Sequence, residues 1–288
     1  MCDDRTEAEN LEHLGARKLT RRQFGAVSAG AGLAWLWPRV ANARAVTEQE
    51  IDVATPDGVA DCFFVTPDSG AHPGVIIWPD AFGLRPAMRQ MARRLSESGY
   101  SVLVVNPYYR AQRAPVVSST NFAEVRETLM PLMGALNAET QTRDAIAMAG
   151  WLDRQPSVDQ SRGMGTMGYC MGGPFTMRTA AALPDRIRAA ASFHGGGLVT
   201  QAADSPHLLV PRMRAQYLFA IAANDDQNQP EAKTVLRDTF AQAGLQAEIE
   251  VYTGAMHGWC PPDSTVYHEE QAERAWSRLM VLFGRALA

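Results

Sequence analysis

The segment MGYCMGGP, Met167 to Pro174, places a cysteine between glycines. It follows the strand-like segment GMGTMGYC and precedes PFTMRTAAAL, which has the composition of a helix. A sharp turn from strand to helix leaves no room for side chains two positions before and after its central residue. Gly168 and Gly172 meet that requirement around Cys170. The pattern is the G-x-S-x-G turn that presents a serine nucleophile, with cysteine in the serine's place.

Two interpretations of Cys170 follow from this turn. The turn would place the sulfur at a helix N-terminus, where the helix dipole and free N–H groups favour a thiolate and can stabilise an oxyanion. A free cysteine can equally be a small buried hydrophobic residue. The pattern alone leaves both open, so the partners that a nucleophile needs must be sought elsewhere in the chain.

Such partners follow Cys170 in the sequence. The apolar segment LFAIAANDD ends in Asp225 and Asp226, and EIEVYTGAMHGW carries His257 between two glycines. Nucleophile, acid, histidine is the chain order of the α/β-hydrolase fold. A histidine must reach the thiol to manage its proton, and an acid must hold the imidazole in the correct tautomer. We prefer Asp225 as the acid and Asp226 as a turn-stabilising neighbour, although the sequence does not settle that choice.

The segment from Val46 to Ala288 alternates short apolar strands with helical segments and contains no internal repeat or linker. Strands such as PGVIIWPD and YSVLVVNP are apolar along their length, as in a sheet buried on both faces. We therefore expect one α/β domain over residues 46–288, with a mostly parallel central sheet and helices on both faces. Ligands bind where loops leave the carboxyl ends of such strands, and the candidate residues lie in these loops.

The N-terminus predicts location rather than fold. Arg21 and Arg22 precede an uncharged run, residues 23–38, and small-x-small sites end at Ala45. This arrangement resembles a twin-arginine export signal over residues 1–45, which implies a periplasmic protein that meets the membrane only during export. The alternative is a membrane anchor, but the run is shorter than the roughly 20 residues of a spanning helix.

Composition excludes several other classes of protein. The 288 residues are 46% hydrophobic and 20% charged, with a formal net charge of -4 and no Lys/Arg-rich block. A nucleic-acid partner is therefore not expected. No group of His, Cys and Asp has the spacing of a zinc site, so we expect no metal.

Four segments in combination resemble the dienelactone hydrolase family of α/β-hydrolases: PDAFGLRPAMRQMARRLSESGYSVLVVNPYYR, GYCMGG, ANDD and YTGAMHGW. The resemblance spans nearly all of residues 46–288. It implies a triad of Cys170, Asp225 and His257 that cleaves a small-molecule ester or lactone through an acyl-enzyme, without metal or organic cofactor. It also implies an oxyanion hole made by the backbone N–H groups of Ala81 and Met171.

The chain departs from the family pattern near the expected pocket. Asp80 stands where family members commonly carry a glutamate, so it either contacts the thiol or caps the following helix. Arg110 and Arg113 lie in the loop that matches a substrate-carboxylate arginine, but the sequence cannot choose between them, and no obvious second arginine follows His257. The dienelactone itself is therefore not an expected substrate. His194 ends a strand at the same edge, where it either lines the pocket or is a structural histidine.

The cysteines give one further expectation. Without residues 1–45, Cys62, Cys170 and Cys260 remain, an odd number for an oxidising compartment. We expect Cys170 to be a free thiol, with Cys62 and Cys260 either paired or separately buried. Two other functions stay open on the sequence: an acyl hydrolase of the same fold, such as a thioesterase, and an exported small-molecule binding protein without catalysis.

Overall fold

The computed structural model describes residues 4–16 and 43–288. Its centre is an eight-stranded sheet in the order β1-β2-β4-β3-β5-β6-β7-β8. β1 and β2 are antiparallel to their neighbours, and all other neighbouring strands are parallel. This confirms the mostly parallel sheet predicted from the sequence. The strands are β1 (Val46–Thr55), β2 (Gly58–Pro67), β3 (Gly74–Trp78), β4 (Ser101–Val105), β5 (Met164–Tyr169), β6 (Ile187–Phe193), β7 (Gln216–Ala222) and β8 (Ala247–Tyr252).

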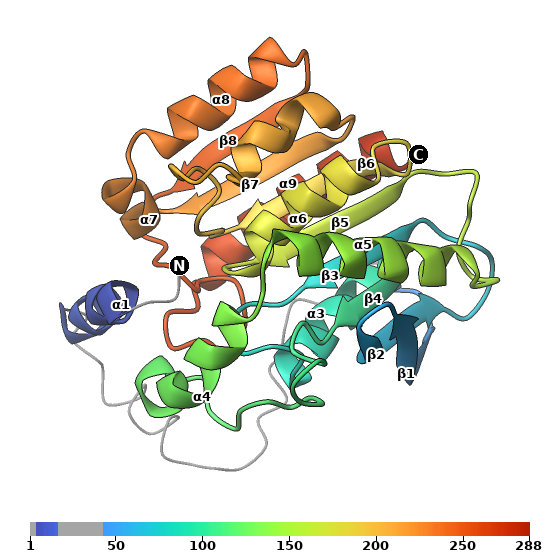
Figure 1. Cartoon of the computed structure of the whole chain (residues 1–288), viewed down its shortest axis with the longest axis horizontal. Helices are drawn as coiled ribbons and strands as arrows, with labels where there is room; N and C mark the ends of the chain where they lie inside the picture. The colour runs from blue at the N-terminus through green and yellow to red at the C-terminus, as the bar shows by residue number, and fades with distance from the viewer. Residues whose placement is uncertain (1–3, 17–42) are drawn as a thin grey trace.

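Helices cover both faces of the sheet, as Figure 1 shows. One face packs against α4, α5, α6 and α8, and the opposite face packs against α3 and α9. Side chains alternate between the two faces along each strand, so Ile76 joins the first core and Ile77 the second. The helices are α1 (Asp4–Ala16), α3 (Pro86–Glu97), α4 (Phe122–Gly134), α5 (Ala138–Asp153), α6 (Gly172–Ala182), α7 (Ala223–Asn228), α8 (Ala232–Gln242) and α9 (Glu269–Ala286), with a 3-10 helix at Pro206–Arg212.

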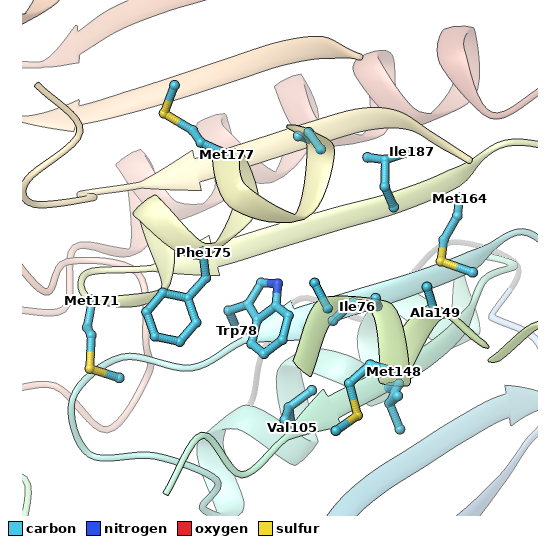
Figure 2. Close-up of a cluster of buried hydrophobic side chains, with 14 of the residues drawn as sticks. Ile76, Trp78, Val105, Met148, Ala149, Met164, Met171, Phe175, Met177 and Ile187 are labelled. Carbon is cyan, nitrogen blue, oxygen red and sulfur yellow. The ribbon is translucent and has the colours of Figure 1, made fainter. Parts of the chain in front are cut away.

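The end of β3 is packed tightly against α6 (Figure 2). The Trp78 and Phe175 rings meet edge to face, with centroids 5.4 Å apart. The indole Nε1 of Trp78 also donates a hydrogen bond of 3.1 Å to Thr179 Oγ1. Burying each of these aromatic side chains contributes about 1.5–3 kcal/mol to stability. The packing fixes the N-terminal end of α6, which follows Cys170, against the loop that leaves β3.

Two elements differ from the sequence-based expectation. β1 was not predicted, because its sequence VTEQEIDVAT is mostly polar and its side chains are largely exposed. It is an edge strand, where charged residues protect the sheet from pairing with other chains. The second difference concerns Asp225, which lies in the first turn of α7 rather than at the end of a strand. Acidic residues favour that position because of the partial positive charge of a helix N-terminus.

The predicted export signal falls mostly outside the described residues, because residues 1–3 and 17–42 are not among them. The paired arginines therefore remain a sequence-based prediction. The described part of that segment is α1, which lies beside α4 and α7 (Figure 1). Among residues 4–16 and 43–288, no helix has the length and apolar character needed to cross a membrane.

Candidate active site

Cys170 lies at the turn between β5 and α6, in the strained geometry expected of a nucleophile turn. Its φ of 50° is in the left-handed region, and its side chain is buried. A Cβ at Gly168 would lie 2.1 Å from the Gly172 carbonyl oxygen, and a Cβ at Gly172 would lie 2.3 Å from that of Trp78. These atoms are backbone, so they cannot move aside cheaply. The steric requirement for glycine on both sides of Cys170 is therefore confirmed.

The buried His257 and the partly exposed Asp225 form a pair beside Cys170. Both carboxylate oxygens of Asp225 accept from the imidazole Nδ1, at 2.9 and 2.8 Å. Asp226 instead binds Lys233 Nζ at 2.6 and 2.7 Å, so the geometry selects Asp225 as the partner of the histidine. Although burial alone would lower it, the Asp225 carboxylate and the Cys170 sulfur raise the pKa of His257 to about 10. The imidazole is therefore cationic at neutral pH.

Tyr108 contacts both of the expected oxyanion-hole residues, Ala81 and Met171. Met171 immediately precedes α6, where backbone N–H groups have no helical acceptor. The Tyr108 hydroxyl donates to the Ala81 carbonyl oxygen at 2.7 Å and lies 3.4 Å from Met171 Sδ. The structure shows that the Tyr108 hydroxyl connects the two loops.

Asp80 belongs to an ion-pair cluster in which it and Arg85 are buried and Asp263 is partly exposed. Arg85 donates to both oxygens of Asp80, at 2.7 and 2.9 Å, and to both oxygens of Asp263, at 2.7 and 3.0 Å. Burial raises the pKa of Asp80, and the Arg85 guanidinium works against that shift. Asp80 also accepts from the Phe82 N–H at 3.0 Å. Arg85 and Asp263 were not identified from the sequence, because nothing local marks them as partners.

His194 is fully buried between the sheet and the candidate pocket. Its ring is edge-on to that of His257, with centroids 5.1 Å apart, and its φ is 40°. Both ring nitrogens lack a hydrogen-bond partner among the described residues. Burial, reinforced by the neighbouring His257, holds the pKa of His194 well below its usual range. This histidine is therefore neutral and carries unused hydrogen-bonding capacity.

Arg110 and Arg113 lie away from the cavity, and this corrects the expectation that one of them reaches the substrate. Arg110 pairs with Asp57 at 2.5 Å and with Asp144 at 2.7 Å. Arg113 pairs with Asp52 at 2.8 Å on the surface. Carboxylates of neighbouring segments hold both side chains, and neither guanidinium is among the residues that line the cavity.

A cavity of about 40 Å³ lies beside Cys170. Its walls include side chains of the N-terminal helix α1 and of the loop that follows β8. Its lining residues are Thr6, Glu7, Asn10, Asp80, Phe82, Arg85, Thr120, Phe122, Cys170, His194, His257, Gly258, Ser264 and Thr265. Cys170, His194, His257 and Asp80, which the sequence placed in separate loops, therefore meet in one place.

A model of the dienelactone hydrolase family matches residues 60–287. The chain belongs to the dienelactone hydrolase family. Membership makes it a hydrolase of the ester and lactone type, with the α/β-hydrolase fold.

Relatives of this dienelactone hydrolase family member come from distant bacteria. The carboxymethylenebutenolidase of Rhodococcus opacus is 25% identical over 225 residues, which are 76% of this chain and 84% of that protein. A Salmonella typhi protein classed with the carboxymethylenebutenolidases is 27% identical over 219 residues, 75% of this chain and 78% of that one. The crystal structure of a dienelactone hydrolase-like protein from Klebsiella pneumoniae has a TM-score of 0.73 at 23% identity, covering 84% of this chain and 100% of its own. The similarity to the Klebsiella pneumoniae structure shows that the two proteins share a fold.

The remaining thiols of this family member are structural. Cys62 and Cys260 are buried and free, so of the two alternatives left by the sequence the structure has them separately buried. Burial raises the pKa of both thiols, which makes them unreactive. Among the described residues, no group of three or more His, Cys, Asp or Glu side chains is arranged to hold a metal ion.

Proposed function

We propose that this dienelactone hydrolase family member cleaves a small-molecule ester or lactone through an acyl-enzyme on Cys170, with His257 and Asp225 as the other members of the triad. The observation that carries the proposal is the buried His257 imidazole, held at Nδ1 by both Asp225 oxygens while it lines the same cavity as the Cys170 turn. That arrangement leaves Nε2 to serve the sulfur and the substrate.

The proposed reaction has two halves. The Cys170 thiolate attacks the carbonyl carbon, and the oxyanion that forms is stabilised by the N–H groups of Ala81 and Met171. The carbonyl reforms as the carbon–oxygen bond to the leaving group breaks, and His257 gives its proton to the departing alkoxide. His257 then takes a proton from water as the water attacks the thioester, and the sulfur departs with the acid product released.

Asp80 has a positioning role in this proposal rather than a role in proton transfer. Both of its oxygens are bound by Arg85, and one accepts from the Phe82 N–H. These contacts fix the loop that presents the Ala81 N–H. Asp80 and Arg85 line the cavity together as an ion pair, so the charge of the carboxylate is balanced at the cavity wall.

Tyr108→Phe is expected to lower kcat about tenfold with little change in KM. The variant loses the hydrogen bond that holds the Ala81 peptide, so the oxyanion donor is less well placed in the transition state. Initial rates with p-nitrophenyl butyrate measure both constants. Tyr109→Phe is the matched control, because the Tyr109 hydroxyl binds Thr55 and Asp144 instead. Equal losses of kcat in the two variants would count against the role of Tyr108.

His194 is proposed to bind a polar oxygen of the substrate, because both ring nitrogens are buried without a partner among the described residues. Methoxyacetate and butyrate esters of p-nitrophenol differ only in one oxygen for a methylene. Relative to the unaltered enzyme, His194→Phe is expected to lower the ratio of kcat/KM for methoxyacetate over butyrate about fivefold. Asparagine still offers an N–H donor and tolerates a positive φ, so His194→Asn should lower this ratio less than His194→Phe does. An unchanged ratio in His194→Phe contradicts the assignment.

The type of bond cleaved is tested with a panel of esters, lactones and thioesters. We expect turnover of esters or lactones that disappears in Cys170→Ala. Hydrolysis confined to thioesters would support the thioesterase alternative. Binding of these compounds without turnover, unaffected by Cys170→Ala, would instead support a non-catalytic binding protein.

Export remains part of this proposal and is supported by the sequence of residues 1–45. Paired arginines, a short apolar run and small-x-small sites together fit a twin-arginine signal that directs the protein to the periplasm. Replacing Arg21 and Arg22 together with lysine should leave the protein in the cytoplasmic fraction. An unchanged periplasmic amount of the double variant contradicts the twin-arginine route.

A further inference from the structure

The helix α1 forms part of the wall around Cys170. Thr6, Glu7 and Asn10, on one side of this helix, line the same cavity as Cys170 and His257. Thr6 is buried there, whereas Glu12 further along the helix is exposed. Figure 1 shows α1 at the edge of the molecule between α7 and α4, more than 150 residues from the nucleophile turn in sequence.

Polar contacts attach α1 to the backbone that carries His257. Asn224 Nδ2 donates to the Glu9 carboxylate at 2.9 Å, and Asn228 Nδ2 lies 3.0 Å from each Glu9 oxygen. Asn10 Nδ2 donates to the carbonyl oxygen of His257 at 3.1 Å. Asn224 in turn accepts from the His257 backbone N–H at 2.8 Å through its Oδ1. The helix therefore contacts the catalytic histidine directly and through one intermediate side chain.

Glu9 is held there as a carboxylate. Although burial opposes its charge, hydrogen bonds from Asn224, Asn228 and Arg5 keep the pKa of Glu9 below its usual range. Two amide donors from α7 thus converge on one anionic acceptor of α1 beside the triad. Hydrogen bonds to a charged group are among the stronger polar contacts in proteins, so this attachment is specific.

The cavity that remains is too small for a substrate. Its volume of about 40 Å³ has room for only a few water molecules. Sites for small molecules measure about 300 Å³ or more. Since α1 supplies several of the walls, its departure would enlarge the space in front of Cys170.

We infer that α1 is an intramolecular cover that blocks Cys170, and that substrate enters only when α1 leaves the site. The inference rests on the proposed function, because it concerns the same cavity. α1 belongs to the segment 1–45 that the sequence predicts to be an export signal. Removing that segment would therefore remove the cover, and the chain would be far less active before processing than after it.

The test compares the full chain with the same chain cut at a protease site inserted between Ala41 and Asn42, after separation from the released segment. Two rates are measured: alkylation of Cys170 by iodoacetamide, located by peptide mass mapping, and kcat/KM for p-nitrophenyl butyrate. Both are expected to rise about tenfold or more on release of α1, the effect of losing a few hydrogen bonds that hold a closed state. A synthetic peptide of residues 1–16 should lower both rates again.

Point variants of the full chain test the same idea without cleavage. Glu9→Ala removes the carboxylate that Asn224 and Asn228 hold, and is expected to raise both rates about fivefold or more. Glu12→Ala is the matched control, because it removes the same charge from an exposed position of the same helix. It should leave both rates unchanged.

The outcomes separate the cover from the catalytic proposal. Equal alkylation rates of Cys170 in the full chain, the cut chain and Glu9→Ala overturn the cover, whatever the enzyme hydrolyses. Faster alkylation on release of α1 without turnover of any ester or lactone supports the cover and contradicts the proposed function.

Discussion

Replacing His257 with glutamine is expected to lower kcat/KM for p-nitrophenyl butyrate about a thousandfold. Glutamine can occupy a similar volume, but it can neither protonate a leaving alkoxide nor take a proton from water. In the proposed reaction the effect is large because the cationic imidazole stabilises the thiolate of Cys170, on which acylation depends. Initial rates over a range of substrate concentrations give the constant directly.

The two neighbouring aspartates provide a matched control for the proposed triad. Asp225→Asn removes the negative charge and puts an NH2 donor in place of one of the two oxygens that accept from His257 Nδ1, which favours the wrong tautomer and should lower kcat/KM at least a hundredfold. Asp226→Asn makes the same chemical change at a residue that binds Lys233, so its effect should stay within about twofold. Similar losses in both variants would show that charge near α7, rather than orientation of the imidazole, matters.

The pH dependence of the unaltered enzyme follows from the same pair. Asp225 and Cys170 raise the pKa of His257 to about 10, so the imidazole carries a proton at neutral pH. For an ester with an alkoxide leaving group, kcat/KM is expected to fall as the pH rises through about 10, because His257 then lacks the proton that the departing alkoxide needs. The residual activity of His257→Gln should not show that fall.

Arg85→Met is expected to lower the free energy of unfolding by about 3–5 kcal/mol at neutral pH, measured by urea denaturation. The buried guanidinium holds Asp80 and Asp263 together, and its loss leaves two carboxylates facing each other. Methionine fills much of the space of the arginine side chain, so the loss of stability arises from the uncompensated carboxylates rather than from a cavity. Asp263 is partly exposed and can be solvated by water, whereas Asp80 cannot.

The variant also has a predicted pH dependence, because burial raises the pKa of Asp80. A group whose pKa is higher in the folded than in the unfolded protein binds its proton more tightly in the fold. The bound proton of Asp80 therefore stabilises the folded state at acidic pH, and this stabilisation is lost as the pH rises through the folded-state pKa. The deficit of Arg85→Met should shrink on acidification, and the double variant with Asp80→Asn should be more stable than Arg85→Met alone. A deficit that is independent of pH and unrelieved by Asp80→Asn contradicts this explanation.

Local rules were sufficient to predict the nucleophile turn. Gly168 and Gly172 are dictated by backbone sterics that act within a few residues, so the sequence reveals them directly. The positions of Asp225 and His257 follow from chain order in a parallel sheet, which places the ends of β7 and β8 at the same edge as Cys170.

The residues that support the site were not predictable in the same way. Arg85 meets Asp263 across 178 positions, and each looks like an ordinary surface charge in sequence. Arg110 and Arg113 were both candidates for the substrate because their loop matches that of the family, but Asp57 and Asp144 bind the guanidinium of Arg110 and Asp52 binds that of Arg113. Which carboxylate an arginine binds depends on which side chains the fold brings together. The docking of α1 is of this kind, since a short polar helix carries no signal for the surface it will contact.

An active-site titration tests directly whether a covalent acyl-enzyme forms on Cys170. The protein lacking residues 1–42 is mixed with p-nitrophenyl acetate, the release of nitrophenol is followed from the first milliseconds, and the quenched protein is mapped by peptide mass. The account predicts a burst of about one nitrophenol per chain, with the acetyl group on the peptide that contains Cys170. Turnover that proceeds undiminished in Cys170→Ala, or an acetyl group that maps to another residue, would contradict it.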